Sequence, residues 1–171
     1  PTRRSSDLLI INTGSTGSFR KDFALGDVVY TNQFMYSDVD ATGFDYAFGQ
    51  VPQMPASYPV AAKWLQVIET VLAQATIPAH QGLIVTADSF MSDQTSVAAI
   101  RQKFPEIIAS DMESAAIAQI AHFYDIPVIN LRGISDHVGE EAPDTFTDTL
   151  DLAATQAFKA VKALVDYYQN A

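Results

Sequence analysis

The chain has 171 residues with a formal net charge of −10, 48% hydrophobic and 18% charged residues, and no cysteine. This length suits one domain or most of a larger one. The acidic balance offers no basic stripe for nucleic acid, no apolar run reaches the roughly 18 residues of a membrane span, and three scattered histidines form no zinc pattern. We therefore expect a cytoplasmic globular protein without metal, nucleic-acid or membrane partners.

The first eight residues, PTRRSSDL, are polar and basic, unlike the acidic remainder. The octapeptide matches one reading frame of a common sequencing adapter. We therefore interpret residues 1–6 as a non-native scar and residues 7–171 as the domain.

Apolar runs and helical periodicities alternate along the domain. The run at 8–12 predicts a buried strand that enters a Gly-rich turn, TGSTGS, at 13–18. A β-branched and aromatic strand within 25–41 and an aromatic loop at 42–55 follow. The remaining predicted elements are a helix at 59–75, a strand at 82–90, a Ser92-capped helix at 93–103, a strand at 106–110, a helix at 112–124, a strand at 127–131 and a helix at 147–168.

This alternation predicts the fold class, an α/β domain with a three-layer, mostly parallel or mixed sheet and helices on both faces. Ligands of such sheets gather at the carboxyl ends of the strands. That rule places 13–15, 88–91, 110–113 and 132–136 on one rim, so we expect the polar residues there to form a site.

Glu113 has two interpretations. With Ser110 it fits a capping box, which needs no ligand. It also begins the stripe Glu113, Ile117, Ile120 and Tyr124, which predicts a carboxylate on the inward face of its helix. A carboxylate in that position could accept hydrogen bonds from ligand hydroxyls.

Asp136 follows an apolar strand, with Arg132 four residues earlier. The two side chains could form an ion pair at the strand end. Alternatively, partial desolvation raises the pKa of Asp136 and lets it donate a proton to a leaving group.

Other features are less specific. Gly14 and Gly17 around Ser15 match neither a dinucleotide fingerprint nor a P-loop, although they could bring backbone amides close to a ligand. Aromatic and apolar side chains in or beside loops fit a core or an oligomer interface, or they could stack on a flat heterocycle. These side chains are Phe44, Tyr46, Phe48, Phe90, Met91 and Phe146.

Six blocks occur in a familiar order and spacing: IINTGSTG, LGDVVYT, FDYAFGQVP, GLIVTADSF, SDMESAAIAQIA and NLRGISD. Together they resemble the bacterial methylthioadenosine/S-adenosylhomocysteine nucleosidases of the purine nucleoside phosphorylase superfamily, over essentially all of 7–171. The resemblance implies hydrolysis of the bond between adenine and ribose in 5′-thio-substituted nucleosides, for methionine salvage and methyl-cycle recycling. It also implies a homodimer and no cofactor.

The resemblance further implies a role for each matching residue. Asp136 protonates the imidazole side of the departing adenine, Glu113 holds the ribose hydroxyls, and Met112 packs on the sugar. The other implied site residues are Phe90 stacking on adenine, the Met91 backbone reading its edge, Ser135 supporting Asp136, Ser15 and Arg132 near the attacking water and the sugar, Phe146 along the 5′ substituent, Asp111 beside the substrate, and Phe44 and Pro52 from the neighbouring subunit.

The sequence also departs from the pattern. Bacterial phosphorylases place a phosphate-binding arginine where Asn12 stands, which favours water as the nucleophile here. Full-length family members begin with roughly 60 to 70 more residues, about half a small domain, that carry the water-activating glutamate. We therefore expect this chain to be impaired alone. A hydrolase or phosphorylase for futalosine, adenosine or inosine, and a non-catalytic nucleoside-binding remnant, are the alternatives.

Overall fold

The computed structural model describes residues 8–139 and 141–169. The proposed scar at 1–6 lies outside these residues. None of the helices within them combines the length and apolarity required to cross a membrane.

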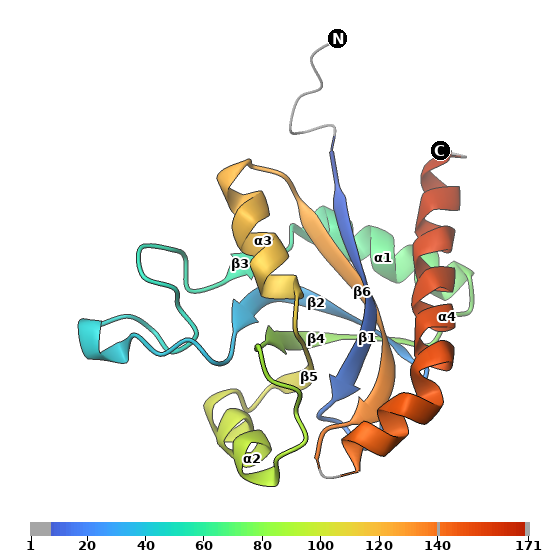
Figure 1. Ribbon diagram of the computed structural model, residues 1–171. Coiled ribbons are helices and arrows are strands. Elements are labelled where there is room, and N and C mark those ends of the chain that lie inside the picture. The colour runs from blue at the N-terminus through green and yellow to red at the C-terminus, as the bar shows by residue number, and fades with distance from the viewer. Residues whose placement is uncertain (1–7, 140, 170–171) are drawn as a thin grey trace.

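The described strands form one mixed sheet (Figure 1). They are β1 (Ile10–Ser18), β2 (Val28–Tyr36), β3 (Tyr58–Pro59), β4 (Ala79–Thr86), β5 (Ile107–Asp111) and β6 (Val128–His137), in the order β3-β2-β4-β5-β1-β6. The pairs β1–β6, β2–β4 and β4–β5 are parallel. Because β2 also pairs with β6 in antiparallel fashion, five strands close into a ring that the sequence did not predict.

Helices pack around the outside of this ring, with α3 and α4 on opposite flanks of the strands (Figure 1). The helical elements are η2 (Thr42–Phe44), α1 (Ala62–Gln74), α2 (Gln94–Lys103), α3 (Ser114–Phe123) and α4 (Ala142–Gln169). This arrangement confirms the predicted α/β class with a mixed sheet between helices.

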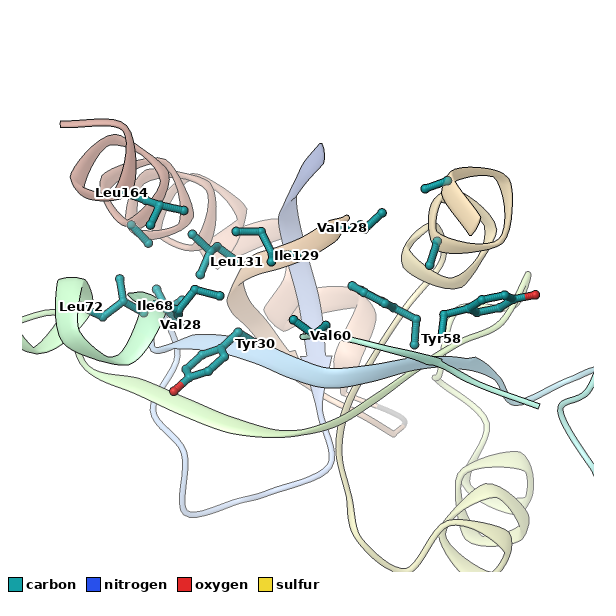
Figure 2. Close-up of a cluster of buried hydrophobic side chains, with 14 of the residues drawn as sticks. Val28, Tyr30, Tyr58, Val60, Ile68, Leu72, Val128, Ile129, Leu131 and Leu164 are labelled. Carbon is teal, nitrogen blue, oxygen red and sulfur yellow. The ribbon is translucent and has the colours of Figure 1, made fainter. Parts of the chain in front are cut away.

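The core is divided between the outside and the inside of the ring. Val28 of β2 belongs to the large cluster beneath the helices, with Ile68 of α1 and Leu164 of α4 (Figure 2). Its neighbour Val29 belongs instead to a cluster with Ile134 of β6, because successive strand side chains point to opposite faces. The ring is therefore filled with side chains beneath the rim.

Two strands are longer than predicted. β1 continues through the glycines of 13–18, where we expected a turn, and β6 continues from Arg132 to His137. Glycine within a strand often marks a close approach by another group. Here a Cβ on Gly14 would lie 3.3 Å from Nη2 of Arg132. The glycines thus leave room for side chains of the neighbouring strand and do not form a turn.

Two helix starts also differ from the prediction. The cap of α2 is Asp93, whose carboxylate accepts the Ser96 amide at 2.7 Å, and Ser92 is not the cap. The last helix begins at Ala142 rather than at 147. Pro143 fits its first turn, where an amide proton would have no helical partner.

Candidate active site

A cavity of about 170 Å³ opens on the rim where β1, β5 and β6 end. Its wall includes ten side chains that the sequence singled out: Ser15, Phe90, Met91, Asp111, Met112, Glu113, Arg132, Ser135, Asp136 and Phe146. Thr16, Gly17, Ser89 and Ser110 complete the lining. The strand-end rule thus predicted nine of the ten, and Phe146 of α4 joins them.

Asp136 owes its position to an irregularity in β6. Thr16 pairs with Ile134 but Gly17 pairs with Asp136, so Ser135 is an extra residue opposite β1. Such a bulge redirects side chains locally, and both Ser135 and Asp136 line the cavity. Gly17 is required beside them, because a Cβ there would lie 3.0 Å from Oδ2 of Asp136.

The Asp136 carboxyl group is almost fully buried, with the residue 2% exposed. Burial raises the pKa of Asp136, and this effect outweighs the hydrogen bond from the Ser135 hydroxyl to Oδ1 at 2.7 Å and the nearby His137, which lower it. This direction agrees with the second interpretation of Asp136, a desolvated carboxyl group at the rim. Among the described residues, Arg132 makes no ion pair with Asp136.

Glu113 lies in a different setting. Its side chain is 54% exposed, and Oε2 accepts a hydrogen bond from Nη2 of Arg132 at 2.7 Å. The guanidinium is itself buried and also donates to the Ser15 carbonyl at 2.8 Å. A fixed cation thus orients a carboxylate that still faces the opening.

The capping box predicted for Ser110 and Glu113 is wrong. Ser110 belongs to β5, and the first amides of the helix are instead accepted by Oδ1 of Asp111, from Ser114 at 3.1 Å and Glu113 at 3.4 Å. Thr86 donates to the same oxygen at 2.7 Å. Because protein donors already surround this buried carboxylate, its geometry favours positioning the wall over contacting a ligand.

The inward stripe predicted for α3 is also wrong. Ile120 and Tyr124 are 59% and 67% exposed, whereas Ala115, Ala118 and Ala121 form the buried face. The helix starts at Ser114, so Glu113 precedes it and does not follow its periodicity. Small alanines allow close packing on the sheet and leave large apolar side chains outside.

The apolar part of the wall comes from two loops and α4. Phe90 is 42% exposed, and its ring meets that of Phe146 edge to face with centroids 5.7 Å apart. Met91 is buried, and its carbonyl accepts the Gly139 amide at 2.8 Å. This wall offers a flat aromatic face beside the polar strand ends.

Phe44 and Pro52 do not line this cavity. They belong to a segment, residues 38–57, that projects away from the sheet beyond β2 (Figure 1). Phe44 is 81% exposed near its tip. Lys103 lies 3.2 Å from the centroid of the Phe48 ring, and Gly49 donates its amide to Val39 at 2.8 Å, so the segment is held in a defined shape.

The sequence did not predict the contacts among three buried polar side chains behind the wall. Nδ2 of Asn12 donates to the Ser114 hydroxyl at 2.7 Å, and Asn130, which pairs with Asn12 in the sheet, lies 3.4 Å from the same oxygen. A signal was present, because each asparagine interrupts an apolar strand and must find a partner when buried. Among the described residues, no cluster of three or more His, Cys, Asp or Glu could hold a metal ion.

Comparison with known families agrees with this fold and rim site. The profile of the Phosphorylase superfamily matches residues 6–166, so the chain belongs to that superfamily. A 5′-methylthioadenosine/S-adenosylhomocysteine nucleosidase of Anoxybacillus flavithermus is 40% identical over 159 residues, covering 92% of this chain and 68% of the relative. The same enzyme of Oceanobacillus iheyensis is 40% identical, covering 95% and 71%. Within the superfamily, the chain belongs to this nucleosidase family and spans about two thirds of these relatives.

Solved structures agree. The nucleosidase of Colwellia psychrerythraea in complex with adenine has a TM-score of 0.88 and 36% identity, covering 92% of this chain and 66% of that one. That of Neisseria meningitidis in complex with methylthio-immucillin-A also has a TM-score of 0.88, with 39% identity and coverages of 92% and 68%. The futalosine hydrolase of Helicobacter pylori has a TM-score of 0.86 at 27% identity, covering 92% and 67%.

Proposed function

We propose that the cavity binds a 5′-thio-substituted adenosine, 5′-methylthioadenosine or S-adenosylhomocysteine, and serves hydrolysis of its N-glycosidic bond to adenine and the thio-ribose. The observation that carries the proposal is one cavity wall holding two carboxylates in unlike environments, Asp136 buried and Glu113 paired with a cation. Relatives that are complexed with adenine and with methylthio-immucillin-A support the choice of ligand.

Asp136 is suited to act as the general acid. Cleavage leaves electrons on the purine, which departs more readily when its imidazole-side nitrogen is protonated. A carboxyl group whose pKa is raised by burial keeps a proton to give, and the Ser135 hydroxyl then stabilises the carboxylate that results. The exposed ring of Phe90 is suited to hold the base flat beside it.

Glu113 is suited to hold the sugar. An ionised carboxylate accepts two hydrogen bonds, which matches the neighbouring hydroxyls of a ribose. Arg132, which orients it, lies four residues before Asp136 on β6, so one strand supports both ends of the cavity. Met112, half exposed beside Glu113, offers an apolar surface to the sugar.

The base that activates water has no candidate on the described wall. Of the lining carboxylates, Asp111 is surrounded by protein donors, Glu113 is paired with Arg132, and Asp136 is assigned to the leaving group. We propose that this base lies outside the described residues. A non-catalytic nucleoside-binding protein is the corresponding alternative.

We also propose a homodimer in which Phe44 and Pro52 complete the partner's cavity. Two features support it. Phe44 is 81% exposed and does not line its own cavity, and the segment at 38–57 that carries it projects away from the sheet (Figure 1). The outer face of α3 exposes Ile120, Phe123 and Tyr124 together, and an exposed apolar patch of this kind is typical of a protein–protein interface. The cytoplasmic location stays a prediction from composition.

Futalosine is the second candidate substrate, because a futalosine hydrolase shares the fold. Calorimetry with adenine, methylthio-immucillin-A and futalosine, together with adenine release from 5′-methylthioadenosine with and without phosphate, tests the proposal. We expect binding of adenine and of the immucillin, and slow adenine release that phosphate does not stimulate. Preference for futalosine, or phosphate-dependent release, would contradict it.

A further inference from the structure

A line of buried polar groups runs behind the cavity wall and ends at Glu113. The Ser114 hydroxyl donates to the Asp111 carboxylate and accepts from Nδ2 of Asn12 at 2.7 Å. Oδ1 of Asn12 accepts from Nη1 of Arg132 at 3.3 Å, and Nη2 of Arg132 donates to Glu113 at 2.7 Å. Asn12 and Ser114 do not line the cavity themselves.

Two carboxylates, those of Asp111 and Glu113, lie within reach of the Arg132 guanidinium, and these hydrogen bonds determine how it is shared between them. Nε of Arg132 lies 3.5 Å from Oδ2 of Asp111, whose side chain is fully buried, and buried charges attract each other with little screening. Glu113, more than half exposed, would lose the guanidinium if Asp111 had no other donors. The hydroxyl groups of Ser114 and Thr86 and the amides of Glu113 and Ser114 supply them. Ser114 is the side-chain donor to Oδ2, the oxygen nearest Arg132, which leaves Nη2 of Arg132 for Glu113.

Asn12 holds the other end of the guanidinium. Its amide turns toward Ser114 and Arg132, with both its donor and its acceptor engaged inside the protein. Asn12 thus links the Ser114 hydroxyl to the Arg132 guanidinium.

We propose that Ser114 and Asn12 are positioning residues that keep Arg132 on Glu113 and so orient the carboxylate for the ribose hydroxyls. The inference rests on the proposed function. It concerns the sugar alone, because the Asp136 carboxylate accepts its hydrogen bond from Ser135, which is not part of this line. Loss of these hydrogen bonds should lower the affinity for ligands that carry ribose hydroxyls and leave the affinity for adenine unchanged.

The test is Ser114→Ala, with calorimetric affinities for adenine, methylthio-immucillin-A and 2′,3′-dideoxy-5′-methylthioadenosine. We expect about tenfold weaker binding of the immucillin, as for loss of a buried hydrogen bond to a charged group, and affinities within about twofold for the two ligands without hydroxyls. Ser18→Ala is the matched control, because Ser18 is also buried but bonds its hydroxyl to the Arg20 carbonyl at 2.9 Å. It should leave all three affinities unchanged.

Asn12→Ala removes the next link and should give the same selective loss, which keeps the proposal testable if Ser114→Ala does not fold. Equal weakening of adenine and immucillin, or no weakening of either, would overturn the positioning role while the proposed function stands. A wild-type chain that binds neither ligand would overturn the proposed function itself, and the inference with it.

Discussion

The two ends of the cavity each hold a carboxyl group, Asp136 at one end and Glu113 at the other, in different environments. Asp136 is buried, has a neutral hydroxyl as its hydrogen-bond donor and has a raised pKa. Glu113 is half exposed and is bonded to a buried guanidinium. Environment, rather than residue type, makes the first suited to donate a proton and the second to accept hydrogen bonds from hydroxyls.

The two ends are also supported by different parts of the fold. A bulge in β6 and a glycine in β1 make room for Asp136. Glu113 depends on a network of polar side chains across β1, β5, β6 and the start of α3. Mutations at each end should therefore have separable effects on the base and on the sugar.

The largest expected effect is that of Asp136→Asn. The amide cannot donate the proton of an acid, so adenine release should fall by a factor of about 10² to 10⁴, while methylthio-immucillin-A still binds. Single-turnover release of adenine and calorimetry measure the two quantities. Unchanged release would remove Asp136 from the mechanism.

Glu113→Gln should have the next largest effect, on binding. Replacing a charged acceptor by a neutral one costs about 1.5 to 3 kcal/mol, so the affinity for the immucillin should fall by roughly ten- to a hundredfold, with adenine unaffected. Phe90→Ala is the contrasting variant, because loss of stacking should weaken both ligands alike. An equal loss of both ligands in Glu113→Gln would contradict the division of the cavity.

Phe44→Ala tests whether a second subunit adds to the sugar end. The affinity for the immucillin should fall by about three- to tenfold, because the aromatic ring no longer covers the 5′ substituent, and adenine should bind as before. Phe158→Ala, which removes another exposed ring, at 66% exposure on α4, is the control. Light scattering gives the oligomeric state, and a monomer at working concentrations would contradict this proposal.

The smallest effect concerns stability and pH. Because the pKa of Asp136 is raised in the folded state, the folded protein holds this proton over a range where the unfolded chain has lost it. The group therefore lowers the free energy of unfolding as pH rises through that range. Asp136→Asn should be more stable than wild type at pH 8, and the difference should shrink toward pH 4. Urea titrations at several pH values measure it, and a constant difference would contradict the assignment.

Much of this architecture was predictable from local patterns. The periodicity of 59–75 predicted α1, and the strand-end rule predicted nine of the ten dispersed residues on one wall, all but Phe146. Prediction from the sequence failed where tertiary contacts outweigh local sequence patterns. Gly14 and Gly17 indicated a turn, but they lie in a strand. The absence of a Cβ at these positions leaves room for the side chains of Arg132 and Asp136.

The polar network illustrates the other limit. A capping box and a helical stripe were both plausible for Glu113, and both failed because Asp111 caps the helix from the preceding strand. The closure of β2 onto β6 could not be read from either strand alone. Such pairings depend on how the whole sheet coils, which no short window of sequence contains.

A crystal structure of the chain with methylthio-immucillin-A tests the central claim most directly. We predict the imidazole side of the base within hydrogen-bond distance of the Asp136 carboxyl group, and the sugar hydroxyls on the carboxylate of Glu113. A ligand bound with its base at Glu113, or outside this cavity, would contradict the account.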